Sequence, residues 1–144
     1  MRGVSKLKAL TGAVCKTNPI LKQHDWKGRL MKQFIKVMKA LSDPNRVKMV
    51  KILQARPLCV CEIKEALGIA QSTASKHLKQ LEDAGLVRSF KDGLWVNYSL
   101  ADGSDSPYSA SMIGNLKHWL DEEEDIRDLN RVLPGIRREN IVGK

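Results

Sequence analysis

Two short helical patterns on either side of a glycine turn constrain the fold of this chain most strongly. The first covers Val60–Leu67 and is followed by Gly68, a residue suited to the left-handed conformation that ends helices. The second runs from about Gln71 to Ala84, and its apolar positions recur at helical spacing: Ala74, Leu78 and Leu81. Two short helices joined in this way are typical of a helix-turn-helix, whose second helix reads DNA.

After Gly85 the apolar period changes from helical spacing to alternation. Residues 87–91 and 95–100 are rich in aromatic and β-branched side chains and flank Asp92-Gly93, a dipeptide typical of type I′ hairpin turns. A two-stranded hairpin is marginally stable alone, so it must lean on the helices. The sequence therefore predicts a winged helix-turn-helix.

Three further helices complete the predicted fold. One begins near Lys27 and carries a broad apolar stripe, which indicates either a central helix or a subunit interface. Asp43-Pro44 begins the next with an N-cap and a proline at the first helical position, and the last runs from about Pro107 to Leu129. We expect the acidic run 121–125 to form a solvated face in the half of that helix where the dipole disfavours acids.

The predicted class is α+β and mostly helical, with five main helices and a two-stranded wing. We expect residues 1–26 to form an N-terminal arm, 27–129 the DNA-binding and dimerisation domain, and 130–144 a loosely held tail. One domain with extensions is what 144 residues can support.

The charge distribution favours a polyanionic partner. The net charge is +9, and residues 30–100 carry 12 basic and 6 acidic side chains, whereas residues 101–144 carry 6 basic and 9 acidic ones. No apolar run approaches the roughly 18–20 residues that span a bilayer, and Lys6 and Lys8 interrupt any signal-peptide core. We therefore expect a cytoplasmic protein without a membrane partner.

The three cysteines form an odd set, which disfavours a closed disulfide framework. In a reducing compartment the Cys59-Val60-Cys61 pair indicates metal binding or redox activity. Side chains two residues apart diverge on a regular helix, so we place Cys59 before or at the helix start. Free N–H groups there lower the pKa of a thiol and favour the thiolate that binds metal.

Several short motifs occur together in the order found in one known family. They are Ser42-Asp43-Pro44, Leu58-Cys59-Val60-Cys61-Glu62-Ile63, Ser75-Lys76-His77-Leu78 and Asp92-Gly93. On these residues the chain, over about 30–125, resembles the ArsR/SmtB family of metal-responsive bacterial repressors. The resemblance implies a homodimer joined by its first and last helices, repression by the metal-free protein, and release from operator DNA when metal binds.

The same resemblance implies a thiolate site at Cys59 and Cys61. In one type of arsenic sensor a third cysteine follows three residues later, but Lys64 stands there in this chain. Other members complete the site with an N-terminal cysteine, often from the partner subunit, and Cys15 is the one candidate here. The family's second site, in the last helix, is rejected because Asn115, Lys117 and His118 offer too few ligands.

Three thiolates suit a soft, three-coordinate ion such as As(III) or Sb(III), and they neutralise its charge. The sequence therefore predicts As(III) or Sb(III) as the inducer, bound by Cys15, Cys59 and Cys61, with no organic cofactor. Two alternatives of the same fold stay open: a Cd(II) or Pb(II) sensor, and a thiol redox switch. A structural zinc would want four ligands.

The predicted DNA contacts lie on the second helix of the motif and on the wing. Ala70 stands where the family often has a capping Ser or Thr, which leaves the start of that helix open. Hydroxyl, amide and imidazole groups can reach base edges or phosphates, and the lysines are expected to meet phosphates. The predicted set is Gln71, Ser72, Thr73, Ser75, Lys76, His77 and Lys79, with Arg88 and Lys91 on the wing.

Two other function classes are weighed against this one. An enzyme such as a thiol reductase is disfavoured, because the chain lacks a thioredoxin-like setting, a phosphate loop and a nucleophile–base pair. A structural DNA-binding protein with inert cysteines is the other. The operator sequence, the physiological inducer, the subunit that contributes Cys15 and the role of the two tails are not readable from the sequence.

Overall fold

The computed structural model describes residues 25–143. The chain divides into two compact units, residues 1–32 and residues 33–144. In the first unit the described residues, 25–32, are helical. The predicted N-terminal arm, with Cys15, lies outside the described residues, and the predicted domain boundaries stay predictions.

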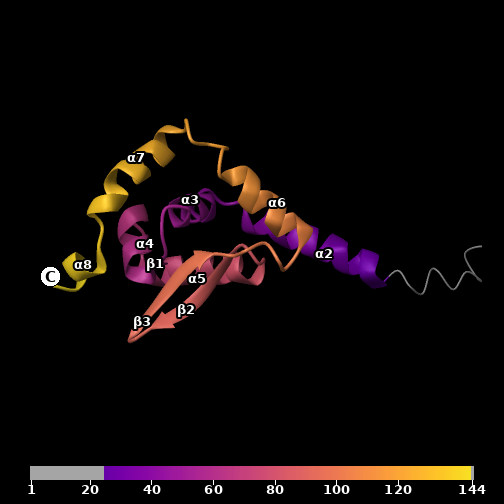
Figure 1. Cartoon of the computed structure of the whole chain (residues 1–144), viewed down its shortest axis with the longest axis horizontal. Coiled ribbons are helices and arrows are strands. Elements are labelled where there is room, and N and C mark those ends of the chain that lie inside the picture. The colour runs from indigo at the N-terminus through magenta and orange to yellow at the C-terminus, as the bar shows by residue number, and fades with distance from the viewer. Residues whose placement is uncertain (1–24, 144) are drawn as a thin grey trace, which may run out of the picture. The chain divides into compact units, whose positions relative to one another are not determined.

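The described elements follow one another as helices interrupted by a small sheet (Figure 1). No helix among them is long and apolar enough to cross a membrane. The helices are α2 Asp25–Ala40, α3 Pro44–Leu53, α4 Val60–Leu67, α5 Gln71–Asp83, α6 Pro107–Leu116, α7 Glu124–Val132, the 3-10 turn η2 Leu133–Gly135 and α8 Arg138–Val142. The strands are β1 Leu58–Cys59, β2 Val87–Asp92 and β3 Trp95–Leu100.

The helix boundaries around the predicted motif agree closely with the local signals. The Asp43 carboxylate accepts a hydrogen bond from the Arg46 N–H at 3.1 Å, and Pro44 begins α3. Gly68 ends α4 with φ of 63°, a conformation that glycine adopts without strain. Helix α5 begins at Gln71 although Ala70 supplies no side-chain cap.

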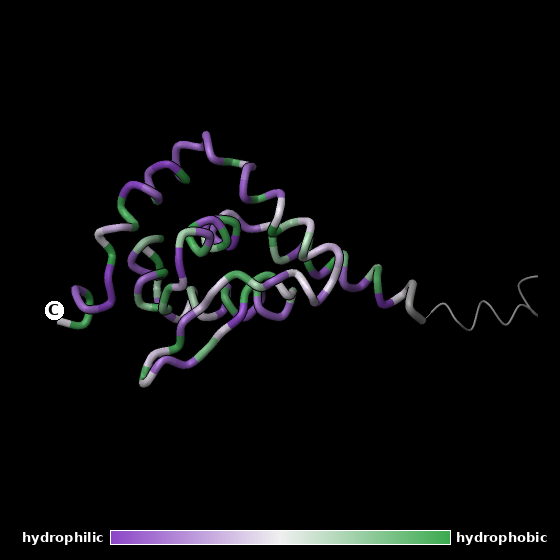
Figure 2. Tube along the Cα trace, viewed as in Figure 1, coloured by the Kyte–Doolittle hydropathy of each residue, from purple (hydrophilic) through white to green (hydrophobic). Residues whose placement is uncertain are grey.

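The core is built mainly by α3, α4 and α5 with the sheet. Figure 2 shows hydrophobic positions recurring along α3 and α5, whereas α7 is mostly hydrophilic. Buried apolar side chains from all four elements meet in one cluster, which includes Met49, Ile52, Leu58, Ile63, Ala74, Leu78, Leu81 and Leu86. Burial of these faces fixes the angle at which α5 is presented.

The sheet has three strands, one more than predicted. β2 pairs with β3 as an antiparallel hairpin, and β1 adds to the other side of β3, with Leu58 opposite Tyr98 and Cys59 opposite Asn97. A strand of two residues carries too little alternation to be recognised from sequence. This strand is important because it joins Cys59 directly to β3 of the wing.

The hairpin forms as predicted, but its turn is displaced by one residue. Asp92 pairs with Trp95, so the two loop residues are Gly93 and Leu94. Gly93 has φ of 61° and Leu94 does not have positive φ, a combination that belongs to type II′ and not to type I′. The Asp-Gly signal therefore predicted the hairpin, but it placed the turn one residue too early and gave it the wrong type.

The predicted last helix is broken into two. Helix α6 ends at Leu116, Leu120 takes φ of 66°, and α7 begins at Glu124. Trp119 and Leu120 would continue the apolar face of a single long helix, but they are 53% and 43% exposed. The cause is Lys51 of α3, whose ammonium group donates to the carbonyls of Leu116 and Trp119 and holds the chain in an irregular turn.

This break changes the environment of the acidic run. Glu123 is the N-cap of α7, and Glu124 and Asp125 lie in its first turn, where the helix dipole favours acids. Asp121 and Asp125 also pair with Lys51 and Lys48 of α3. All five acids of the run are exposed, so the expected solvated face is confirmed, but the expectation that they lie in an unfavourable half of a helix is wrong.

Residues 130–143 are not the loosely held tail that we expected. Leu133 is 4% exposed and belongs to the core cluster. The Arg56 side chain donates to the carbonyl of Ile136 at 2.6 Å. Pro134 and Gly135 interrupt the helical pattern in this segment and suggested a loose tail, whereas the tertiary contacts show that it is packed.

Candidate functional site

The two cysteines of the central motif lie at the junction of β1 and α4. Cys59 is the N-cap residue of α4 with extended backbone (φ −79°, ψ 164°), and Cys61 lies in the first turn of α4. The structure therefore brings the two sulfurs together, and they form a disulfide. The expectation that Cys59 stands at the helix start is confirmed.

A carboxylate that the sequence argument overlooked supports this junction. Glu62 is 6% exposed, and its Oε2 accepts from the backbone N–H of Cys59 at 2.9 Å. Its Oε1 accepts from the Arg56 guanidinium at 3.1 Å. An acid three residues after an N-cap is a known capping pattern, so the sequence held a signal for Glu62.

The donor set for a soft metal ion is incomplete within the described residues. Cys59 is 1% exposed and Cys61 is half-buried, and reduction of their disulfide would leave two thiols at one point. Residues 25–143 hold no group of three His, Cys, Asp or Glu side chains arranged for a metal. The pair fits a thiophilic ion as two of three ligands.

Helix α5 presents its polar face away from the core. Ala74, Leu78 and Leu81 are buried. The predicted contacts divide by exposure: Gln71, Ser72, Ser75, Lys76 and Lys79 are exposed, and Thr73 and His77 are half-buried. The exposed set is a continuous strip of hydroxyl, amide and ammonium groups, which can donate to phosphates and base edges.

Two of the predicted residues on α5 have partners in the protein. The Lys79 ammonium lies 3.0 Å from the Asp83 carboxylate, and the hydrogen bond to Asp83 raises the pKa of Lys79. Nδ1 of His77 lies 3.2 Å from Nη1 of Arg46. Arginine has only donors, so Nδ1 accepts in this contact and the ring is held against α3.

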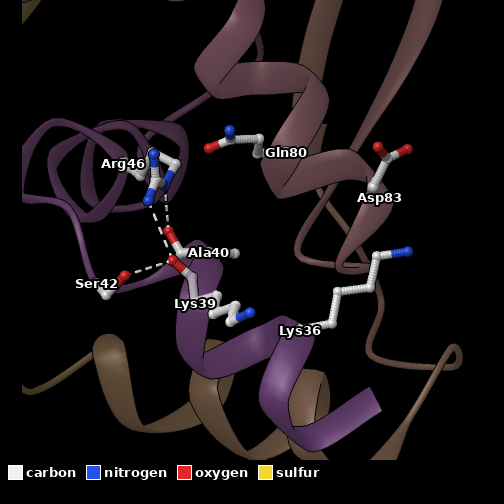
Figure 3. Close-up of a pocket in the computed structure, with 7 residues that line it drawn as sticks. All are labelled: Lys36, Lys39, Ala40, Ser42, Arg46, Gln80 and Asp83. Carbon is white, nitrogen blue, oxygen red and sulfur yellow. Dashed lines mark hydrogen bonds between the residues drawn. The ribbon is translucent and has the colours of Figure 1, made fainter. Parts of the chain in front are cut away.

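Arg46 is a second residue that the sequence argument overlooked. Its Nε donates to the carbonyl of Ala40 at 2.6 Å and its Nη2 to that of Lys39 at 3.0 Å, so it caps the end of α2 (Figure 3). The same side chain contacts His77 of α5. Arg46 thus ties the end of α2 to the polar helix, through contacts that no local pattern reports.

The same part of the structure contains an open pocket. Figure 3 shows it between the end of α2 and the C-terminal half of α5. Its lining mixes basic groups with one acid: Lys36, Lys39, Ala40, Ser42, Arg46, Gln80 and Asp83. Its lining includes neither Cys59 nor Cys61, so it is separate from the thiol pair.

The wing is attached to α5, and its two predicted basic contacts differ in whether they are paired with acids. Glu82 accepts from the backbone N–H and the hydroxyl of Ser89 at 3.1 and 2.6 Å, which fixes β2 beside α5. Arg88 lies 2.9 Å from an Asp102 oxygen and 3.7 Å from Asp105. Lys91 is exposed and makes no ion pair with any residue in 25–143. Lys91 is therefore the freer cation of the two predicted on the wing.

Comparison with known proteins shows the family to which this chain belongs. The family described as "Bacterial regulatory protein, arsR family" matches residues 43–89. The arsenical resistance operon repressor of Escherichia coli is 32% identical over 112 residues, which cover 76% of this chain and 89% of that protein. The chain belongs to the arsR family. This is a family of regulatory proteins, in agreement with the expectation of a regulator and not an enzyme.

Other arsR-family relatives share the central part of the chain. A cadmium resistance transcriptional regulatory protein CadC homolog of Staphylococcus aureus is 43% identical over 68 residues, 46% of this chain and 56% of that protein. The chain thus spans about half the length of this relative.

Among solved structures, a homodimeric winged helix-turn-helix DNA-binding domain of Mycobacterium bovis, a possible ArsR-family regulator, matches with a TM-score of 0.56. It is 30% identical and covers 65% of this chain and 82% of its own. The predicted fold, a winged helix-turn-helix, is confirmed.

Proposed function

We propose that this chain is a transcriptional repressor that binds operator DNA as a homodimer and is released when As(III) or Sb(III) binds its cysteine thiolates. The observation that carries the proposal is the position of Cys59 and Cys61. The two sulfurs meet at the start of α4, the helix that precedes α5, and Cys59 is also paired with a strand of the wing. A ligand there acts on both DNA-contacting elements.

The DNA contacts follow from the exposed strip of α5 and from the wing. In this proposal Ser72, Ser75 and Lys76 enter the major groove, and Lys91 meets the backbone or the minor groove beside it. Thr73, His77, Lys79 and Arg88 contribute less in the conformation described, since each is half-buried or engaged with a protein partner.

A second copy of the chain is the partner that α2 supports. Phe34 and Ile35 are 39% and 42% exposed, and the Phe34 ring packs edge-on against Tyr108 of α6 with ring centroids 5.3 Å apart. Apolar side chains shared by α2 and α6 fit a homodimer of the kind that the resemblance implies, and the Mycobacterium bovis domain is described as homodimeric.

The inducer is a thiophilic ion bound by Cys59, Cys61 and a third ligand, for which we propose Cys15. The chain offers no further thiol, since it has three cysteines in all. Similarity to arsenical and cadmium resistance regulators supports the class of ligand. Cd(II) or Pb(II) is the alternative, and three thiolates would leave such a site with net negative charge.

Direct binding measurements test this proposal. The reduced dimer is titrated into a labelled DNA duplex selected from a random-sequence pool, with and without As(III), and anisotropy is recorded. We expect As(III) to weaken binding about 5- to 150-fold, the usual range of allosteric coupling. X-ray absorption on the loaded protein should show a sulfur first shell. Equal DNA affinity with and without As(III), Cd(II) and Pb(II), or an oxygen or nitrogen shell, contradicts it.

The disulfide favours one other mechanism, a thiol redox switch. Oxidation of the two thiols by hydrogen peroxide would join their sulfurs, release two protons and two electrons, and reduce the peroxide to two waters. Loss of DNA binding with peroxide, restored by a dithiol and not produced by metal ions, would identify this mechanism. Cys61→Ser abolishes the disulfide and should abolish that response.

A further inference from the structure

The C-terminal segment Leu133–Val142, which contains η2, a two-residue link and α8, lies against both the thiol junction and the wing. Leu133 anchors it in the core. Helix α8 then packs against α4 (Figure 1). A segment in this place can connect two elements that are far apart along the chain.

The connection to the thiol junction is a chain of hydrogen bonds. The backbone N–H of Cys59 donates to Glu62, Glu62 accepts from Arg56 on its other oxygen, and Arg56 donates to the carbonyl of Ile136. Glu62 is buried, so its two hydrogen bonds hold it in one orientation. A displacement of the Cys59 backbone would therefore shift the C-terminal segment through the side chains of Glu62 and Arg56.

The connection to the wing is made by Arg138. Both terminal nitrogens of its guanidinium donate to Oδ2 of Asp92 at 3.2 Å. The guanidinium also lies over the Trp95 ring, 5.8 Å from its centroid. Asp92 and Trp95 form the last pair of the hairpin before its turn, so Arg138 grips the wing near its tip.

Residues of the two connections line one open polar pocket of about 190 Å³ beside α4, the wing and α8. Asn97, the partner of Cys59 in the sheet, lies on its wall. The wing is thus held at two points, in the middle of β3 by β1 and near its tip by Arg138, and both points lead to Cys59.

We propose that Arg138 is a positioning residue for DNA binding, which sets the wing relative to the thiol junction and transmits the state of Cys59 and Cys61 to it. This inference rests on the proposed function and adds a role for the C-terminal segment. The Arg138–Asp92 pair is partly exposed, and such pairs contribute little to overall stability. Arg138→Ala is therefore expected to fold.

The neighbouring arginine supplies a matched control. Arg137 lines the same pocket, but it makes no ion pair with any residue that the structure describes. Arg137→Ala and Arg138→Ala change the net charge equally, so a general loss of attraction to DNA affects both alike. A charge swap, Asp92→Arg with Arg138→Asp, tests whether the pairing itself matters.

The first measurement is amide hydrogen exchange of the free, full-length protein. Arg138→Ala should speed exchange at least about twofold in residues 90–97 and leave α3 and α5 unchanged, because a hairpin without support opens more easily. Arg137→Ala should match the parent protein, and the charge swap should restore slow exchange. Unchanged exchange in Arg138→Ala, or equal effects of both alanine variants, overturns the inference.

The second measurement is the ratio of DNA affinity without As(III) to that with As(III), by anisotropy on the selected duplex. Arg138→Ala should lower this ratio about 2- to 30-fold, the range for residues along a coupling route. If the parent protein responds to As(III) and the Arg138→Ala variant shows the same affinity ratio, this inference is overturned and the proposed function stands. A parent protein that does not respond overturns the proposed function and the transmission step together, while the exchange result still decides the positioning role.

Discussion

Lys51 is the residue whose side chain does most to shape the C-terminal half of this protein. It is 3% exposed, and its ammonium group donates to the carbonyl of Leu116 at the end of α6, to that of Trp119 in the turn that follows, and to the Asp121 carboxylate. A cation at a helix C-terminus is favoured by the dipole and satisfies carbonyls that lack partners within the helix.

Lys51→Met should therefore destabilise the protein. Removal of the ammonium leaves buried carbonyl acceptors without donors, which costs about 1–3 kcal/mol of unfolding free energy. Lys48→Met is the matched control, because the ion pair that Lys48 makes within residues 25–143 is with the exposed Asp125, and such a pair is worth about 0–1 kcal/mol. Urea unfolding measures both. Equal midpoints for the two variants would show that Lys51 is not a cap.

Asp102, which pairs with Arg88 at the base of the wing, makes the stability of the protein depend on pH in the acid range. Hydrogen bonds from the side chain and backbone of Ser104, with Arg88 nearby, lower the pKa of Asp102 below its ordinary 3.8. A lowered pKa in the folded state means that the stabilisation is present above 3.8 and is lost as pH falls through the folded value. The loss therefore lies in the acid range, below 3.8.

The Asp102→Asn variant should show this directly. At pH 7 it should be less stable than the parent protein, and the difference should shrink as pH is lowered past the pKa of Asp102. Thermal unfolding followed at a series of pH values measures the difference. A gap that stays constant down to the lowest pH would mean that ionisation of Asp102 plays no part.

At the scale of elements, α5 is a helix with a weak beginning. Ala70 occupies its N-cap position with extended backbone (φ −66°, ψ 147°) and offers no oxygen to the first N–H groups. Ser72 does not take over, because α5 already begins at Gln71. The donors left free are the ones that DNA phosphates can use.

Ala70→Ser should strengthen α5. A serine at an N-cap contributes about 1 kcal/mol relative to alanine, since its oxygen accepts from the second or third helical N–H. Ala70→Val, which fits extended backbone but offers no acceptor, is the control. Chemical denaturation of both variants measures the effect, and no gain for the serine would place the cap elsewhere.

The last helix shows how an element can be misjudged although its sequence pattern is sound. Ser106 caps α6 by accepting from the Ser109 N–H at 3.1 Å, as Ser106-Pro107 predicts. The apolar period then continues through Trp119 and Leu120, so the sequence favours one long helix. The contacts of Lys51, 65 residues away from Leu116 in the chain, end it early.

At the scale of the whole molecule, the basic charge is arranged for a polyanion. The exposed strip of α5 and Lys91 on the wing lie on elements joined by the Glu82–Ser89 contacts. Each lysine that meets a phosphate releases a counterion on binding, so affinity should fall steeply with salt.

Lys76→Ala should lower DNA affinity and reduce the slope of log K against log salt by about 1, as expected for one lost phosphate contact. Lys117→Ala removes the same charge from the exposed end of α6, away from the strip, and should leave the slope unchanged. Anisotropy at several salt concentrations measures the slopes. Equal slopes for the two variants would exclude α5 as the phosphate-contacting helix.

The sequence by itself determined the winged helix-turn-helix and the place of the thiol pair. Helix caps, glycine stops and apolar periods act within a few residues, and those local preferences agree with the tertiary packing from Asp43 to Leu100. A local argument also placed Cys59 at a helix start, because side chains two residues apart diverge on any regular helix.

Only the tertiary structure decided how these parts are connected. The pairing of Cys59 with Asn97, the split of the last helix by Lys51 and the grip of Arg138 on Asp92 join residues 38 to 65 positions apart. Such contacts depend on the angles at which whole elements pack, and single polar residues leave no periodic trace. The routes from the thiol junction to the wing therefore became visible only in three dimensions.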